Sequence, residues 1–253
     1  MMVSTVLPPV RRHGFPEGIN EPFWLFANDI AMKSHPRYQE AKAGVKEAAV
    51  ELIVDLALEY LLTIKDKLPA NAIYVAPHAR EATGDNAIPQ VLAAACAVVA
   101  TGETEADIVQ ITRVFHTGAD PMERMSLKPE FAGAVTPGAQ YVLVDDVTNM
   151  GGTLAELANY ILSLGGTIAA VVVLVNAGRV KSFRPNRFVI QKLEKRYANE
   201  IEEIFGIIPS ALTANEANYL IGFKSADEIR NRITKARKET DLRLRSKGIE
   251  RKS

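Results

Sequence analysis

One stretch, residues 141–154 with the sequence YVLVDDVTNMGGTL, most constrains how this chain can fold. It begins with four apolar residues that do not alternate with polar ones, a pattern typical of a strand buried on both faces. Two carboxylates, Asp145 and Asp146, follow where this strand should leave the sheet, and a turn with two glycines then leads into a segment of helical spacing. Such a strand–loop–helix unit points backbone N–H groups and a positive helix end at one place, which favours phosphate binding there.

The two adjacent carboxylates indicate more than a phosphate site, because they can accept hydrogen bonds from the vicinal hydroxyl groups of a phosphorylated sugar. A plain strand–helix turn with two solvated acids is the alternative. The run of apolar residues, two acids and a Thr/Gly-rich loop resembles the ribose-phosphate signature of the type I phosphoribosyltransferases. The resemblance implies that Asp145 and Asp146 are catalytic and that the 5-phosphate is bound by Thr148, Asn149, Met150, Gly151, Gly152 and Thr153.

Two positions of this loop depart from the family's pattern. Where phosphoribosyltransferases usually carry Thr or Ser, this chain has Asn149 and Met150. The amide of Asn149 can donate to a phosphate oxygen, whereas Met150 can contribute only its backbone N–H and can pack inward. Phosphate binding is therefore the property that the loop supports most directly.

Strand-like and helix-like segments alternate through the middle of the chain. Strands are expected at 72–76, 107–113, 141–144 and 168–175, with helices at 38–67, 88–100 and 154–164. Gly44 weakens the first of these helices and favours a break in it. The alternation predicts an α/β fold with a twisted, mainly parallel sheet flanked by helices, as in the type I phosphoribosyltransferases.

Ligands of such folds bind at the carboxyl ends of the strands, so three loops should meet at one rim. By the resemblance, the loop after strand 72–76 binds pyrophosphate through Pro77, His78, Ala79 and Arg80. A surface ion pair of Arg80 with Glu81 or Asp85 is the alternative. The long polar stretch after residue 112 resembles the family's mobile loop, which would bring basic groups to the pyrophosphate from Arg113, His116, Arg124 and Lys128. A solvated excursion is the alternative for this stretch.

Three parts of the chain are expected. Residues 1–45 form an N-terminal arm and hood, whose aromatic residues Phe23, Trp24 and Phe26 either pin the arm to the core or form a stacking wall for a flat substrate. Residues 46–178 form the phosphoribosyltransferase-like α/β core. Residues 179–253 form a further hood element and a helical C-terminal extension.

The C-terminal part carries its own signals. Helices are expected at 193–205, 213–221 and 225–244, and Thr213 with Glu216 has the spacing of a capping box. Basic residues between the aromatic residues Phe183 and Phe188 can indicate nucleic-acid binding. They can equally belong to a hood over the active site, where the phosphoribosyltransferase family places base recognition, and this resemblance makes Phe183 a candidate for stacking on an acceptor base.

Composition limits the kinds of partner. The 253 residues include 30 basic and 30 acidic side chains, so the formal net charge is zero and a strongly electrostatic nucleic-acid binder is disfavoured. The single cysteine, Cys96, lies in an apolar run and is expected to be a buried thiol. No apolar run has the length of a membrane span, so a cytoplasmic protein without a membrane partner is expected.

The resemblance implies a Mg²⁺-dependent enzyme that transfers the 5-phosphoribosyl group of phosphoribosyl pyrophosphate (PRPP) to a nitrogenous base or similar acceptor and releases pyrophosphate. Mg²⁺ would be held mainly by substrate oxygens, with Asp145 and Asp146 as the protein carboxylates in reach. Because members of the resembled family are usually dimers, the resemblance implies a homodimer. The alternative is a non-catalytic regulator that senses PRPP or a nucleotide and binds nucleic acid or a protein partner through basic residues at 179–187 and 230–252, although the zero net charge weighs against nucleic acid. The chain has no G-x-x-x-x-G-K-[ST] motif, which excludes ordinary P-loop chemistry.

Overall fold

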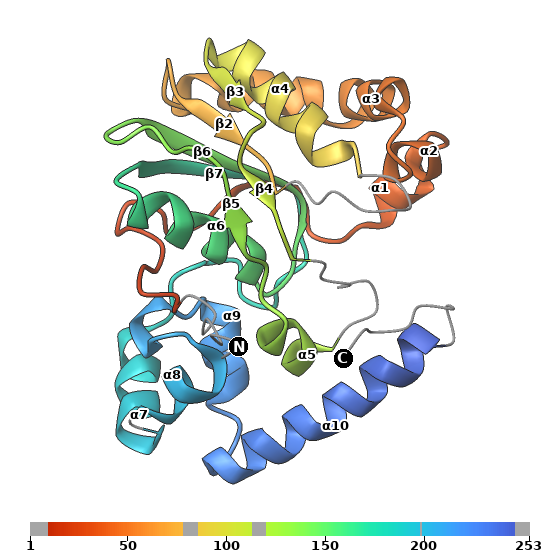
Figure 1. Cartoon of the computed structure of the whole chain (residues 1–253). Helices are drawn as coiled ribbons and strands as arrows, with labels where there is room; N and C mark the ends of the chain where they lie inside the picture. Colours follow the sequence, from red (N-terminus) through yellow and green to blue (C-terminus); the bar gives the residue numbers. More distant parts are fainter. Residues whose placement is uncertain (1–9, 78–85, 113–119, 198, 246–253) are drawn as a thin grey trace, which may run out of the picture.

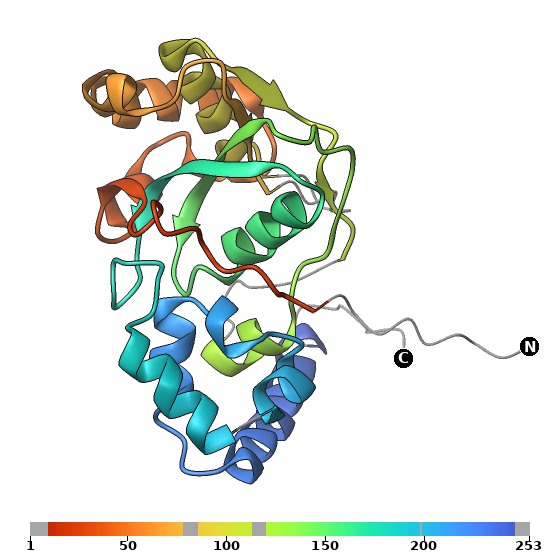
Figure 2. The same ribbon diagram turned by 90° about the vertical axis from the view of Figure 1, so that its left-hand side faces the viewer.

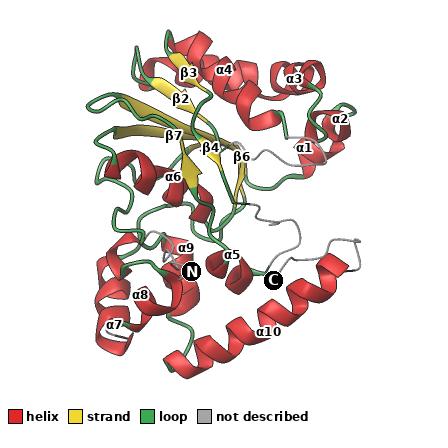
Figure 3. Cartoon of the chain, in the orientation of Figure 1, coloured by secondary structure: helices red, strands yellow, loops and turns green. Residues whose placement is uncertain are grey.

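A five-stranded parallel sheet forms the centre of the molecule (Figures 1 and 3). The computed structural model describes residues 10–77, 86–112, 120–197 and 199–245. The strands of the sheet, in spatial order, are β1 (Phe23–Phe26), β7 (Thr167–Asn176), β6 (Gln140–Thr148), β2 (Ile73–Val75) and β3 (Glu103–Glu105). Each neighbouring pair is parallel, which confirms the expected α/β class with a mainly parallel sheet.

Helices cover both faces of this sheet. Val142 and Val144 of β6 pack on one face against α3 (Lys46–Ile64) and α4 (Ile88–Ala100), whereas Tyr141 and Leu143 point to the other face and pack against α6 (Gly152–Ser163). These β6 side chains are fully buried. Each buried side chain of this kind contributes about 1.5–3 kcal/mol of hydrophobic free energy, so β6 and β7 form the most strongly buried pair of the sheet.

The N-terminal arm contributes a strand that the sequence did not reveal. β1 pairs with β7 at the edge of the sheet, where Phe23 lies beside Val172 and Trp24 beside Val173. The three aromatic residues of this segment pack on the two sheet cores, which favours the pinning interpretation over a stacking wall. Helices α1 (Ile30–Ser34) and α2 (Tyr38–Lys42) follow, and Gly44, with φ of +100°, makes the expected break before α3.

The segment between α4 and β6 differs from expectation. The strand expected at 107–113 is wrong as a strand of the main sheet, because β3 takes that place. The three residues of β3 are polar and lie at an edge of the sheet, so no apolar pattern in the sequence predicts this strand. Farther on, β4 (Val109–Gln110) pairs antiparallel with β5 (Phe131–Ala132), and a short helix, α5 (Pro121–Ser126), lies between them.

The C-terminal part is a helical layer beneath the sheet (Figure 2). Thr213 and Glu216 form the predicted capping box at the start of α9. Two methionines of α5, Met122 and Met125, and Met150 of the β6–α6 loop pack into the apolar core of this layer. None of the helices in the described part of the chain combines the length and apolarity needed to cross a bilayer. The layer contains α7 (Arg187–Tyr197), α8 (Glu200–Phe205), α9 (Ala214–Leu220) and α10 (Ala226–Arg245).

Candidate functional site

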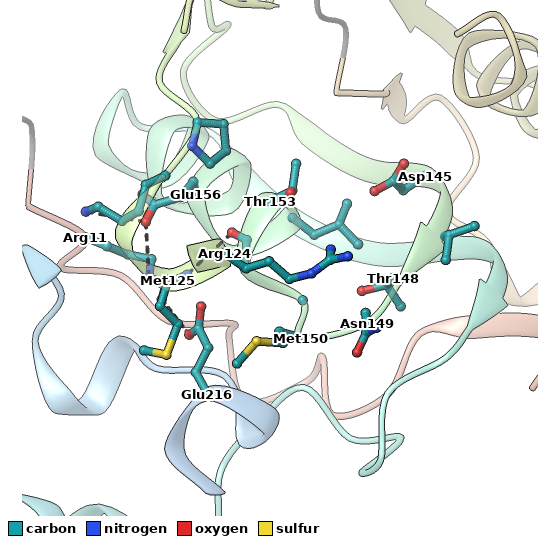
Figure 4. A pocket seen from close by; sticks show the side chains of 16 residues that line it. Arg11, Arg124, Met125, Asp145, Thr148, Asn149, Met150, Thr153, Glu156 and Glu216 are labelled. Carbon is teal, nitrogen blue, oxygen red and sulfur yellow. Dashed lines mark hydrogen bonds and ion pairs between the residues drawn. The ribbon is translucent and has the colours of Figure 1, made fainter. Parts of the chain in front are cut away.

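A cavity that opens to solvent lies between the β6–α6 loop and the C-terminal helical layer (Figure 4). The loop residues 147–154 form one wall. Asp145 projects toward it from β6, and Arg124 reaches in from α5. Charged side chains from distant parts of the chain complete the lining, namely Arg11, Lys128, Glu156 and Glu216. The sequence-predicted phosphate loop therefore does face a cavity.

The two adjacent acids lie inside β6, not beyond its end. The strand continues to Thr148, which pairs with Asn176 of β7, because the backbone hydrogen bonding of the two central strands extends past the acids. Successive side chains of a strand point to opposite faces. Asp145 consequently lines the cavity, whereas Asp146 lies on the α3/α4 face and does not line it. The structure thus separates the two predicted catalytic residues.

Asp146 is engaged by side chains from two other elements. Its Oδ2 atom accepts a hydrogen bond from Asn86 Nδ2 at 2.7 Å and lies 3.3 Å from Lys42 Nζ. Its Oδ1 atom accepts from the backbone N–H of Val147 at 2.8 Å. Burial by itself lowers the pKa of Lys42, but the charge of Asp146 and the neighbouring Tyr38 outweigh burial, so this pKa lies above its ordinary value. The Lys42–Asp146 ion pair is therefore favoured at neutral pH.

Asp145 has a different environment. Its carboxylate accepts one backbone hydrogen bond, from the N–H of Asp146 at 2.9 Å. Burial first, and then the negative charge of Asp146, raise the pKa of Asp145 well above its ordinary value. Removal from water disfavours the charged form of a carboxyl group, and a like charge adds to this effect. Asp145 therefore presents a carboxyl group that retains a proton to higher pH than an ordinary aspartate.

Two hydrogen bonds hold the predicted phosphate loop, residues 148–153, in place. Gly151 has φ of +79°, a conformation that favours glycine, and its carbonyl accepts the N–H of Ala155 at 2.9 Å in the first turn of α6. The Met150 side chain is buried in the C-terminal layer, and its carbonyl accepts the Thr213 hydroxyl at 2.6 Å. The departure at Met150 thus has a packing role, while the exposed Asn149 keeps its side chain at the surface. Thr148 and Thr153 both line the cavity.

Arg11 also lines the cavity, and sequence reasoning missed it. Its side chain is fully buried, with Nη2 2.5 Å from Glu216 Oε2 and Nε 3.6 Å from Glu156 Oε1. Lys128 Nζ lies 3.5 Å from the same Glu156 oxygen and donates to the Gly206 carbonyl at 2.9 Å. Burial raises the pKa of Glu156 and lowers that of Lys128. The sequence signal was weak, because nothing distinguishes Arg11 from the neighbouring arginine.

The other predicted site residues have mixed outcomes. Arg124 and Lys128 line the cavity beside the phosphate loop. The carbonyl of Pro77 accepts from Gln90 Nε2 at 3.5 Å, and Pro77 does not line this cavity. His78, Ala79 and Arg80 of the predicted pyrophosphate loop, and Arg113 and His116 of the predicted mobile loop, lie outside the described residues.

Phe183 corrects the prediction of a base-stacking residue. Only 4% of its surface is exposed, and its ring stacks on Phe15 with the ring centroids 4.4 Å apart. A Cβ atom placed on Gly151 would lie 3.3 Å from the Phe183 ring, so this ring packs behind the phosphate loop. The side chain therefore supports the loop and offers no open face to a planar acceptor.

The residues present fit a magnesium ion that is carried mainly by ligand oxygens. Within the described residues, no three or more His, Cys, Asp or Glu side chains gather as a group that could hold a metal. Asp145 offers a single carboxylate in the cavity, and Asp146 is already bound by Lys42 and Asn86. Mg²⁺ commonly takes one or two carboxylates together with phosphate oxygens and water, which this arrangement permits.

Comparisons with known proteins identify relatives of the sequence. No family model matches the chain. It is 34% identical over 223 residues to a protein named TraN of Escherichia coli, a match that covers 85% of this chain and 49% of that protein. It is 37% identical over 131 residues to an uncharacterized protein of Haemophilus influenzae, covering 51% of this chain and 29% of that protein. The chain thus spans half or less of the length of these two relatives.

Solved structures give a partial likeness. An adenine phosphoribosyltransferase from Rhodothermus marinus has a TM-score of 0.36 and 14% identity, covering 59% of this chain and 88% of that one. The enzyme from Leishmania donovani has a TM-score of 0.36 and 13% identity, covering 61% and 72%. A likeness of this extent carries no functional argument. The functional assignment therefore rests on the sheet, the loop and the cavity of this chain.

Proposed function

We propose that this chain binds a phosphorylated ribose in the cavity and transfers the phosphoribosyl group of PRPP to a nitrogenous base or similar acceptor, with release of pyrophosphate. One observation carries the proposal. Asp145 projects into the cavity that the Thr148–Thr153 loop also lines, so a hydroxyl-binding group and a phosphate-binding loop border one space. A ribose 5-phosphate presents hydroxyls and a phosphate at opposite ends and matches this arrangement.

The phosphate end of the ligand is served by the start of α6. The first N–H groups of a helix point outward and carry a partial positive charge, which stabilises an anion. The hydroxyl groups of Thr148 and Thr153 line the same wall and can donate further hydrogen bonds. The loop therefore supplies neutral donors, and the cationic side chains around the cavity supply the compensating charge.

Asp145 would act at the ribose. In the proposed reaction the bond from C1 to the pyrophosphate oxygen breaks, pyrophosphate leaves with the electron pair, and the acceptor nitrogen forms the new bond to C1 while its proton passes to solvent. Positive charge develops on the ribose ring as the first bond breaks, and a nearby carboxylate stabilises that charge. Mg²⁺ bound to the pyrophosphate oxygens would neutralise the charge of the leaving group.

Binding and turnover test this proposal separately. Titration calorimetry should show binding of ribose 5-phosphate and weaker binding of ribose. Incubation with PRPP, Mg²⁺ and a panel of bases should then release pyrophosphate with one acceptor, and the Asp145→Asn variant should abolish that release. Asp66→Asn is the matched control, since this acid lies exposed on the surface in the short helix after α3. Absence of ribose 5-phosphate and PRPP binding in the native chain would refute the proposal.

A regulatory protein that senses PRPP or a nucleotide is the second candidate. Asp146 favours it, because Lys42 and Asn86 occupy the carboxylate that the reaction was expected to use. Tight PRPP binding without turnover across a broad acceptor panel would support this candidate over the enzyme. The homodimer and the cytoplasmic location stay predictions.

A further inference from the structure

We propose that Arg124 binds the phosphate group of the sugar ligand and that helix α10 positions Arg124 through an ion pair between Arg232 and Asp120. This inference rests on the proposed function, because it assumes a phosphate at the Thr148–Thr153 loop. It differs from the role that the sequence resemblance implied, in which Arg124 served the pyrophosphate. It also gives helix α10 of the C-terminal layer an indirect part in ligand binding, through Asp120 and Arg124.

Arg124 is placed by the short helix α5. Met122 and Met125 of this helix are almost fully buried and pack into the core of the C-terminal layer. Arg124 lies between them in the sequence, is half-buried and lines the cavity. Figure 4 shows its side chain extending along the phosphate loop, with the guanidinium group directed toward Thr148 and Asp145. The two buried methionines therefore fix the helix face that presents Arg124 to the loop.

Asp120 links α5 to α10. Its Oδ1 atom caps α5 by accepting the backbone N–H groups of Met122 at 2.7 Å and Glu123 at 3.1 Å. Its Oδ2 atom accepts from Arg232 Nη2 of α10 at 2.7 Å. An isolated helix of six residues is unstable in water, so α5 depends on this cap and on packing. The position of Arg124 thus depends on the link between Asp120 and Arg232.

The chemistry of the guanidinium group suits a phosphate at this place. Its planar N–H groups can donate two parallel hydrogen bonds to phosphate oxygens. Two further cations line the cavity: Arg11 binds Glu216, and Lys128 lies beside Glu156 and the Gly206 carbonyl. An anion between the start of α6 and Arg124 would meet helix N–H groups on one side and a guanidinium group on the other.

The affinity for ribose 5-phosphate, measured by calorimetry, tests the first half of the inference. Arg124→Gln should weaken binding by about 10- to 100-fold, the range expected for loss of a charge-assisted hydrogen bond. Arg124→Lys should weaken it less, because the charge remains and only the paired geometry is lost. Arg230→Gln is the control, since Arg230 forms exposed ion pairs with Asp227 and Glu200 on α10.

The outcomes separate the inference from the proposed function. If the native chain binds ribose 5-phosphate and Arg124→Gln binds it within twofold of the native affinity, the inference is wrong and the proposed function stands. If the native chain binds neither ribose 5-phosphate nor PRPP, both fail. A selective loss in the Arg124 variants, with unchanged binding by Arg230→Gln, supports the inference.

A double-mutant cycle tests the positioning role of α10. Arg232→Met should weaken ribose 5-phosphate binding several-fold in the native background, but should cause no further loss in the Arg124→Gln background, because the side chain that it positions is then absent. The melting temperature should fall equally in both backgrounds. An equal loss of affinity in both backgrounds would show that Arg232 acts only on stability, and the positioning role would then be overturned.

Discussion

Asp145 and Asp146 have opposite electrostatic surroundings although they are adjacent in the chain. Asp146 accepts from Asn86 and lies beside the Lys42 ammonium group. Asp145 accepts only one backbone N–H in the described structure, and burial and then the charge of Asp146 raise its pKa. Asp145 therefore presents a carboxyl group whose protonation a ligand can change.

The Asp145→Asn variant should be more stable than the native protein at neutral pH, by about 0.5–2 kcal/mol, the range of a typical single stabilising change. Asparagine keeps an oxygen that can accept the Asp146 N–H, but it removes a buried group that resists ionisation. Urea unfolding at pH 7.5 measures this difference. A less stable Asn variant would show that the buried Asp145 carboxyl group does not destabilise the folded protein at this pH.

The pH dependence of stability follows from the same shift. The folded protein holds the Asp145 proton more tightly than the unfolded chain, so stability should decrease as pH rises from about 4, the ordinary range of a carboxyl group, through the raised pKa of the folded state. Glu156, whose pKa burial also raises, contributes with the same sign. Melting temperatures between pH 4.5 and 8 should therefore fall less steeply for Asp145→Asn than for the native chain.

Cys96 should be chemically inert in the folded protein. It is fully buried in α4, and burial raises the pKa of its thiol to about 12. Because the thiolate is the reactive form, a thiol reagent at pH 8 should label the folded protein very slowly and the urea-unfolded protein rapidly. Labelling of the native chain at the rate of a free thiol would show that α4 opens readily.

At the scale of elements, α9 and the phosphate loop share one set of hydrogen bonds. The Thr213 hydroxyl accepts the Glu216 N–H at 3.2 Å and donates to the Met150 carbonyl at 2.6 Å, so one group caps the helix and holds the loop. The Glu216 carboxylate completes the capping box by accepting the Thr213 N–H at 2.8 Å. The start of α9 and the loop are therefore expected to move together.

Thr213→Val should lower stability by about 1–2 kcal/mol, as for the loss of a helix cap, and should also weaken ribose 5-phosphate binding. Thr213→Ser should retain most of both properties. Ser225→Ala is the matched control, because Ser225 caps α10 through the Glu228 N–H and does not line the cavity. It should lower stability with little effect on binding. Equal effects of Thr213→Val and Ser225→Ala on the affinity for ribose 5-phosphate would show that the start of α9 does not position the loop.

Strong periodic patterns allowed the central elements to be predicted. The apolar run of α4 gave its bounds at Ile88–Ala100, and the apolar strands β6 and β7 were found because both faces are buried. Two strands, β3 and β1, were missed because their sequence patterns are weak. β3 is polar and belongs to an edge, and β1 owes its extended form to pairing with β7 along the chain's most apolar strand. Tertiary pairing, not local preference, decides such segments.

At the scale of the whole molecule, Arg11 joins three parts of the chain that are far apart in sequence. Its N–H donates to the Gly206 carbonyl at 2.8 Å, and its own carbonyl accepts from Ile208, so the arm runs beside the C-terminal layer. Its guanidinium group lies between Glu156 of α6 and Glu216 of α9. The N-terminal arm and the C-terminal helical layer thus meet at the wall of the cavity.

Arg11→Met should destabilise the protein by about 3–5 kcal/mol, because the change leaves two buried carboxylates without their shared cation. The adjacent Arg12→Met is the matched control. The Arg12 side chain is 62% exposed and pairs with Glu202, so its loss should cost at most about 1 kcal/mol. Chemical denaturation of both variants measures the contrast, and similar values for the two would refute the buried role of Arg11.

The candidate site was predictable only where it is local in sequence. The loop from Thr148 to Thr153 and the acid Asp145 lie within ten residues, so one local motif and its resemblance to the phosphoribosyltransferase signature pointed to them. Arg11 and Glu216 are 205 residues apart, and their pairing follows from how the helical layer docks on the sheet. A single sequence contains no local signal for such a contact. The division of the two acids between faces was also missed, because the expected strand ended one residue before them.

The contact of the N-terminal arm with Gly206 of the C-terminal layer sets an order of events during synthesis. Both Arg11 and Lys128 donate to the Gly206 carbonyl. Glu216, the carboxylate that pairs with Arg11, is synthesised 205 residues after it. At about 5–20 residues per second this interval lasts on the order of 10–40 seconds. All five strands of the sheet leave the ribosome earlier, so the sheet can form while the cavity still lacks a wall. A nascent chain would therefore form its sheet first and complete the cavity only when residues 206–216 have emerged.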